Sequence, residues 1–166
     1  MDSILEKLSS YNIFNYLLPG VLFAVFGELA TGYSFTYNDL LVALFLYYFI
    51  GLVVSRFGSL VLEPLAKRIG LVKFVEYPQF LKAAAVDPKI EVLSEANNTY
   101  RTLLSVFVLT ILLKLYELLG VRWPFFAEQD IYILVVVLTV VFLFSYGKQT
   151  GYVVKRVRAV LGEPSQ

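Results

Sequence analysis

Four long runs of apolar residues divide the chain, and polar segments separate them. The runs cover about residues 13–30, 40–60, 102–121 and 131–147. A helix needs roughly 20 apolar residues to cross the hydrocarbon core of a bilayer, and about 17 can suffice. The pattern therefore predicts an all-α membrane protein with four transmembrane helices, built as a single membrane domain over residues 1–166.

The beginning of the chain departs from this simple pattern in two places. Residues 3–11 carry Ile4, Leu5 and Leu8 at helical spacing, with polar residues opposite, which predicts a short helix lying on the membrane surface. Pro19 and Gly20 then interrupt the short first run. Proline removes a backbone donor and crowds the preceding turn, so we expect a helix break or kink there.

The most polar stretch, residues 63–100, lies between the second and third runs. Glu63 and Pro64 are expected to close the second helix. Pro78 predicts the start of one short helix, and Asp87 before Pro88 predicts another, because Asp caps helices and Pro suits the first helical position. If the second of these runs unbroken into the third span, the stretch is a small helical segment that extends the membrane domain.

Lysine and arginine are distributed unevenly along the chain. Twelve lie at the N-terminus, between the second and third runs, or in the basic tail 148–166, whereas only Lys114 and Arg122 lie near the other turns. Cytoplasmic loops of membrane proteins carry the excess of these residues. Both termini and residues 63–100 are therefore expected on the cytoplasmic side.

The composition supports a membrane protein and narrows the chemistry. Hydrophobic residues make up 58% and charged residues 16%, against about 45–50% and 25% in soluble domains. A very apolar soluble helical bundle is the alternative, but its apolar residues would form stripes instead of runs. Cysteine and histidine are absent and the net charge is +1. We therefore expect no enzyme, cofactor or metal site, and no direct nucleic acid binding.

A polar stripe leads into the third span. At 100° per residue, five residues share one narrow face if the helix is continuous: Glu91, Glu95, Asn98, Thr102 and Ser105. One interpretation is a pore or vestibule lining in an oligomer. The other is the polar face of a cytoplasmic helix that fades as it enters lipid, with Thr102 and Ser105 bonding their own backbone.

Lys114 and Glu117 lie one turn apart inside the third run. Ionisable residues within a membrane cost roughly 2.5–3.5 kcal/mol each by insertion scales and often serve a function. The pattern favours an intramembrane ion pair or interface anchor, with a transport or gating role as the alternative.

The remaining basic residues near span ends are expected to contact lipid headgroups. They are Arg56, Lys148, Lys155, Arg156 and Arg158. Long basic side chains reach the interface from span ends, and anionic lipid attracts them. Arg56 could instead pair with a nearby carboxylate, such as Glu63 or Glu91.

Three stretches of the sequence carry a resemblance: 11–20 (YNIFNYLLPG), 51–58 and 91–101. They resemble stretches of small, largely uncharacterised bacterial four-transmembrane proteins. The overall layout is similar to membrane proteins that accompany anti-phage defence systems, in which a membrane subunit senses damage or perforates the envelope. The resemblance implies the bacterial inner membrane and supplies no catalytic or ligand-binding residues.

Three functions are consistent with these patterns. The first is an oligomeric inner-membrane effector or sensor of a defence or stress system, which could form a pore, with small residues such as Gly20, Gly27, Ala43 and Gly51 allowing close helix packing. The second is a non-conducting anchor that docks a cytoplasmic protein through residues 63–100. The third is a small ion or metabolite transporter that uses Lys114 and Glu117.

Overall fold

The computed structural model describes residues 13–161, and every regular element among them is a helix. The π-helical turn η1 (Ile13–Leu17) leads into α2 (Leu18–Ala30), and α3 (Leu40–Phe57) continues through a second π-helical turn, η2 (Gly58–Leu62), into α4 (Glu63–Arg68). The remaining helices are α5 (Tyr77–Val86), α6 (Lys89–Arg122), α7 (Pro124–Glu128) and α8 (Asp130–Leu161). The all-α prediction is confirmed, while the predicted surface helix 3–11 lies outside the described residues.

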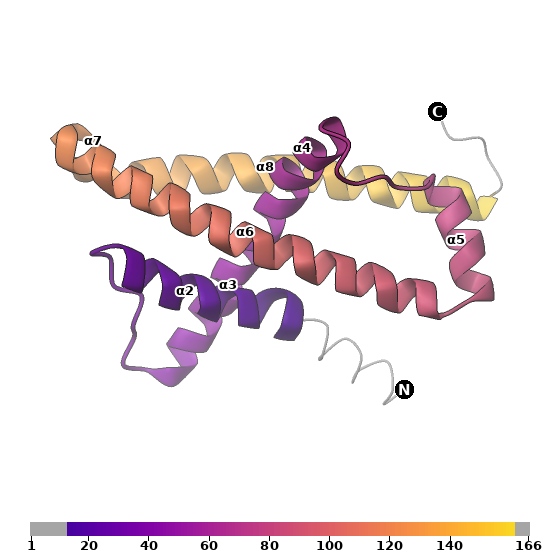
Figure 1. Cartoon of the computed structure of the whole chain (residues 1–166), viewed down its shortest axis with the longest axis horizontal. Helices are drawn as coiled ribbons and strands as arrows, with labels where there is room; N and C mark the ends of the chain where they lie inside the picture. The colour runs from indigo at the N-terminus through magenta and orange to yellow at the C-terminus, as the bar shows by residue number, and fades with distance from the viewer. Residues whose placement is uncertain (1–12, 162–166) are drawn as a thin grey trace.

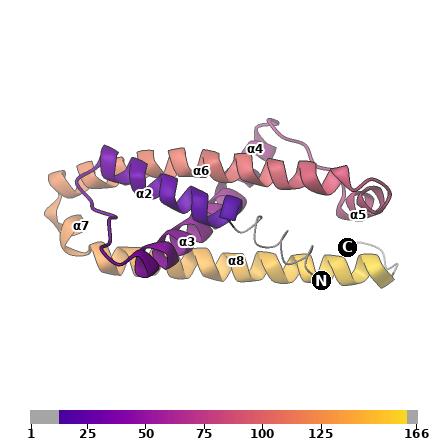
Figure 2. The same ribbon diagram turned by 90° about the horizontal axis from the view of Figure 1, so that it is seen from below.

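Two long helices, α6 and α8, define the length of the molecule (Figures 1 and 2), and α3 crosses obliquely between them. Helix α2 packs against α3 and α6. The turn after α2 and the short α7 lie at one end, called here the α7 end, and α5 with the end of α8 lies at the other, called the α5 end. Side chains from α3, α4, α6 and α8 can therefore meet near the α5 end.

Three helices are long and apolar enough to cross a membrane: Leu40–Arg68, Lys89–Arg122 and Asp130–Leu161. The first apolar helix, Asn15–Ala30, is shorter than the roughly 17 residues that a crossing usually needs. Helix α6 runs without interruption from Lys89 to Arg122, which is the condition set above for a polar stripe on one face. Before its first residue, the Asp87 carboxylate accepts a hydrogen bond from the Lys89 amide at 3.0 Å. Helix α8 carries the basic tail as far as Leu161.

Neither proline expected to interrupt a helix does so. Pro64 was predicted to end the second segment, yet the helical path continues to Arg68, and Pro19 lies in the first turn of α2 without a break before it. Each proline is the second residue after a π-helical turn, η1 or η2. A proline ring clashes with the carbonyl of residue i−4 in an α-helix. The wider π turn relieves that clash, so the chain changes helix type where the sequence suggests a break.

Two glycines allow the N-terminal helix and α3 to cross in backbone contact. A methyl group built on Gly20 would lie 1.7 Å from the Tyr47 carbonyl oxygen, and one on Gly51 would lie 1.7 Å from the Tyr16 carbonyl oxygen. The crossing is therefore reciprocal, with each glycine facing the backbone of the other helix. Small residues allow this close approach in membrane helices, and Ala43 and Gly27 are buried nearby.

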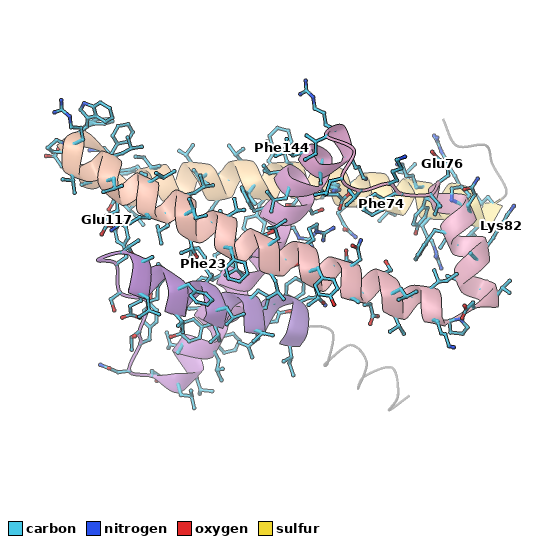
Figure 3. All side chains as sticks on the ribbon, in the orientation of Figure 1. Phe23, Phe74, Glu76, Lys82, Glu117 and Phe144 are labelled. Atoms are coloured by element: carbon cyan, nitrogen blue, oxygen red, sulfur yellow. The ribbon has the colours of Figure 1, made fainter. Side chains whose placement is uncertain are left out.

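The apolar core is small for a chain of this composition. Ala24, Ala43, Val54 and Val106 are the buried hydrophobic residues among those described. Large apolar side chains cover the outside of α8 and much of α6, and Phe144 is one example on α8 (Figure 3). Such an apolar surface exceeds what a soluble monomer exposes. The distribution fits a chain whose outer surface meets lipid or other chains.

Candidate functional site

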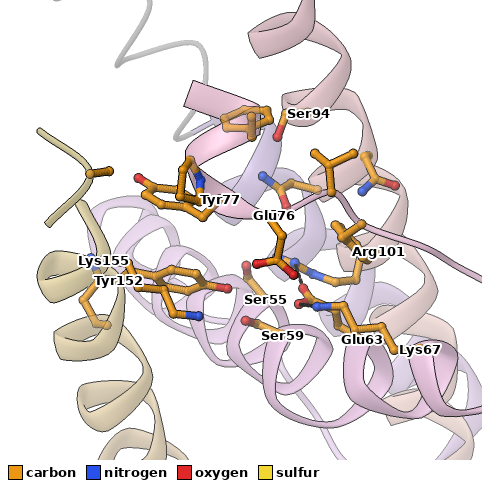
Figure 4. A pocket seen from close by; sticks show the side chains of 18 of the residues that line it. Ser55, Ser59, Glu63, Lys67, Glu76, Tyr77, Ser94, Arg101, Tyr152 and Lys155 are labelled. Atoms are coloured by element: carbon orange, nitrogen blue, oxygen red, sulfur yellow. Dashed lines mark hydrogen bonds and ion pairs between the residues drawn. The ribbon is translucent and has the colours of Figure 1, made fainter. Parts of the chain in front are cut away.

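A cavity of about 950 Å³ opens near the α5 end of the molecule. Its walls come from the α3–η2–α4 helix, the segment leading into α5, the first half of α6 and the last turns of α8. Figure 4 shows polar side chains from all of these elements facing one space. The volume lies within the range of small-molecule sites, roughly 300–1,000 Å³.

The buried carboxylate of Glu63 joins the helices that form this cavity. Its side chain is 8% exposed, and its Oε2 accepts a hydrogen bond from Arg101 on α6 at 2.6 Å. Its Oε1 lies 3.0 Å from the Lys67 Nζ and 3.6 Å from the Lys148 Nζ of α8. One carboxylate thus contacts three cations from three segments. A buried charge is tolerated when it is paired and hydrogen-bonded in this way.

Lys148 fixes α8 to the turn η2. Its ammonium donates hydrogen bonds to the Ser59 carbonyl oxygen at 2.6 Å and to the Ser59 hydroxyl at 2.7 Å. The rings of Phe49 and Phe142 stack at a centroid distance of 5.9 Å and add an apolar contact between α3 and α8. Because α8 buries little else, these contacts are its principal attachment to α3.

The cavity carries an excess of positive charge. Five cationic side chains line it against two carboxylates, a formal excess of three charges. The cations are Arg56, Lys67, Arg101, Lys155 and Arg158, and the carboxylates are Glu63 and Glu76. In addition, the buried Nε of Arg101 has no hydrogen-bond partner. Walls of one charge sign in a partly enclosed space focus the field and attract counter-ions.

Aromatic rings and neutral donors complete the lining. Tyr77 from α5 and Tyr152 from α8 both extend to the cavity (Figure 4). The Lys67 ammonium lies 4.2 Å from the centre of the Phe74 ring. Serine hydroxyls and amide side chains stand between the charges, including Ser55 and Asn97. The surface can therefore both donate hydrogen bonds to an anion and cover an apolar or planar group.

The polar stripe on α6 divides among three environments. Glu91 and Glu95 are exposed, and Asn98 lines the cavity. Thr102 and Ser105 are 0% exposed, and their hydroxyls donate to the carbonyls of Asn98 and Arg101 at 2.9 and 2.8 Å. Ser105 also contacts the backbone at Gly58. In the single chain, Thr102 and Ser105 at the apolar end of the stripe therefore lie in a helix-packing surface.

Lys114 and Glu117 form the expected ion pair, and its surroundings give it a structural role. Glu117 also accepts a hydrogen bond from the Gly32 amide at 2.6 Å, which fastens the turn after α2 to α6 (Figure 3). The neighbouring Tyr116 hydroxyl donates to the Asp130 carboxylate at 2.6 Å. These contacts hold the α7 end together.

The basic residues that were expected to contact lipid headgroups also lie in different surroundings. Lys148 points inward to Ser59, and Arg56, Lys155 and Arg158 line the cavity, whereas Arg156 is exposed and outside the lining. Glu63, named from the sequence only as a possible partner of Arg56, pairs instead with Arg101, and both are central to the cavity. The spacing of Glu63 and Lys67 by one helical turn was the only local signal.

Among the residues that the structure describes, no three aspartate or glutamate side chains gather in a group that could hold a metal ion. Comparison of the chain with protein-family models, with curated proteins and with solved structures finds no match.

Proposed function

We propose that the chain is a multi-pass sensor of the bacterial inner membrane that binds an anionic ligand in the cavity at the α5 end. The observation that carries the proposal is the charge of the cavity, where five cations face two carboxylates in a partly enclosed space. A cluster that only held the helices together would be more stable with nearly equal numbers of positive and negative side chains, because uncompensated charge near a low-dielectric wall costs free energy. A bound anion supplies the missing charge.

Ligand binding is coupled to the membrane helices through Glu63. An anion in the cavity competes with Glu63 for Arg101, and the same Glu63 carboxylate lies 3.6 Å from the Lys148 ammonium, which is the polar attachment of α8. Weakening that attachment changes how α8 docks on α3 and η2. A ligand that binds one arrangement of α8 more tightly than another shifts the equilibrium between the two.

The positive-inside pattern predicts that the α5 end lies in the cytoplasm, and the proposed ligand then comes from the cytosol or from the inner leaflet. In this topology α2 completes a fourth, short crossing, and both termini face the cytoplasm. Assembly into a homo-oligomer, pore formation and a role in defence stay predictions. The burial of Thr102 and Ser105 within the chain favours a sensor over a pore lined by their face of α6.

The test is the distance between α4 and α8 with and without an anion. The chain has no cysteine, so Leu65→Cys on α4 and Val153→Cys on α8, both at exposed positions, can carry spin labels in nanodiscs. We expect pyrophosphate or citrate to shift this distance by about 2 Å, the size of ligand-driven helix shifts. A control pair within α6, Leu93→Cys and Phe107→Cys, should not change. If a saturating concentration of anion left the α4–α8 distance unchanged, the proposed sensor function would be contradicted.

A second candidate, docking of a cytoplasmic protein, is favoured by the exposure of α5 and its surroundings. Helix α5 buries no residue, and Phe74, Val75, Val86 and Val92 are exposed around it. Exposed apolar side chains that gather in one place mark interaction surfaces. Photo-crosslinking from position 92 should trap one soluble protein if this function holds, and the same probe at Val121 near α7 should not.

A further inference from the structure

The cavity is lined by side chains of the types that bind phosphate. Three of the lining cations are arginines: Arg56, Arg101 and Arg158. Guanidinium groups bind phosphate through two parallel hydrogen bonds and remain charged at every physiological pH. Ser55 and Ser59 place hydroxyl donors in the same wall.

The size of the charge excess also favours a phosphorylated ligand over a monocarboxylate. The lining has a formal excess of three positive charges. A single carboxylate compensates one charge, whereas a phosphate ester carries between one and two and a diphosphate carries more. Phosphorylated compounds therefore match this cavity better than monocarboxylates do.

The cavity is much larger than a phosphate group needs. At about 950 Å³ it has room for an organic group as well. Tyr77 and Tyr152 extend to it from α5 and α8, and aromatic side chains stack on planar rings or cover apolar groups. The structure thus provides separate surfaces for a phosphate and for the group attached to it.

Glu76 is a carboxylate directed into the same space. It lies on the segment between α4 and α5, and its side chain points toward the region of Arg101 and Ser55 (Figure 4). A negative charge at this place repels an incoming phosphate. Glu76 therefore lowers the affinity for the ligand, and its neutralisation should raise that affinity.

We propose that the cavity at the α5 end binds an organic phosphate, with the phosphate among the arginines and the attached group against Tyr77 and Tyr152. This inference rests on the proposed sensor function and names its ligand class. A soluble nucleotide and the headgroup of an anionic phospholipid share this chemistry.

The test uses three charge-removing variants of the full chain. Lys155→Gln combined with Arg158→Gln removes two lining cations near the end of α8. Arg156→Gln removes an exposed cation of the same helix that lies outside the lining, so it is the matched control. Glu76→Gln removes the opposing charge. The last variant is informative because a gain of affinity cannot come from misfolding.

Titration calorimetry in phosphatidylcholine nanodiscs measures the soluble ligands: adenosine diphosphate, pyrophosphate and citrate. Native mass spectrometry measures retention of phosphatidylglycerol by the detergent-purified chain. We expect the double variant to weaken binding about tenfold, the control to change it less than twofold, and Glu76→Gln to strengthen it about threefold.

Each outcome decides one part of the proposal. Adenosine diphosphate binding with this variant pattern supports a soluble phosphate, and phosphatidylglycerol retention with the same pattern supports a lipid headgroup. Citrate binding as tightly as pyrophosphate and adenosine diphosphate would overturn the phosphate class but leave the anion sensor standing. No binding of any anion, or equal losses in the double variant and the control, would overturn both.

Discussion

Replacement of Gly51 by alanine should disrupt the closest contact in the fold. The added methyl group would lie 1.7 Å from the Tyr16 carbonyl oxygen and 3.0 Å from the Gly20 nitrogen. Both obstacles are backbone atoms, so no side chain can rotate away. Restoring an ordinary separation of about 3.4 Å requires the helices to move apart by roughly 1.5–2 Å.

The cost of this separation follows from overpacking. Forced insertion of a methyl group into a packed contact costs about 1–3 kcal/mol, and the rigid backbone on both sides places Gly51→Ala near the upper end. Gly20→Ala meets the Tyr47 carbonyl oxygen at 1.7 Å and should cost about the same. One movement relieves both clashes, so the double variant should cost clearly less than the sum of the singles.

The matched controls are two glycines of α8. A methyl group on Gly147 or Gly151 would have no neighbour within 4 Å, so alanine there should stabilise the helix by about 0.5–1 kcal/mol. The assay is reversible unfolding in mixed micelles with increasing dodecyl sulfate, followed by circular dichroism. If Gly51→Ala were as stable as Gly147→Ala, the described crossing of the two helices would be wrong.

Three further substitutions test individual contacts. Glu63→Gln should cost about 2 kcal/mol, because it leaves the partly buried Arg101 and Lys148 without their counter-charge. Glu91→Gln at an exposed position should change stability by less than about 0.5 kcal/mol in the same unfolding assay. Asp39→Ala should lower the free energy of unfolding by about 1 kcal/mol, because the Asp39 carboxylate caps α3 by accepting hydrogen bonds from the amides of Leu41 and Val42 at 2.8 and 3.1 Å. If the effect is confined to α3, amide exchange should become faster in its first turn. Glu117→Ala should speed amide exchange at Gly32 while leaving the α5 end unchanged, since it removes the acceptor of the Gly32 amide; unaltered exchange there would remove the structural role assigned to this carboxylate.

The positions of the helices could be predicted because they depend on local patterns. Runs of apolar residues predicted α3 and the apolar parts of α6 and α8, and the Asp87–Pro88 pair predicted the start of α6. The helical path continues past both prolines for a local reason as well. A proline rule that assumes an α-helix does not anticipate the π turns before Pro19 and Pro64, which make room for the ring.

The cavity could not be predicted, because its contacts depend on how distant segments pack. Glu63 reaches Arg101 across 38 positions of the chain, and Lys148 reaches Ser59 across 89. A basic residue near a span end carries the same sequence signal whether it faces lipid, as expected for Lys148, or the interior, where the structure places it. Only the oblique path of α3 between α6 and α8 brings these groups together (Figure 2).

The most direct test of the account is the location of a bound anion within the molecule. A spin label at Gln79→Cys lies on α5 between the lining residues Pro78 and Phe80, and one at Ala127→Cys lies on α7. On α6 the lining residue Arg101 is 21 residues before Arg122, the last residue of this helix before α7, so at about 1.5 Å per residue the label at 127 lies roughly 30 Å or more from the anion. The account predicts that the phosphorus resonance of pyrophosphate broadens with the label at position 79 and stays sharp with the label at 127. Equal broadening from both labels, or broadening from 127 alone, would contradict an anion site in this cavity.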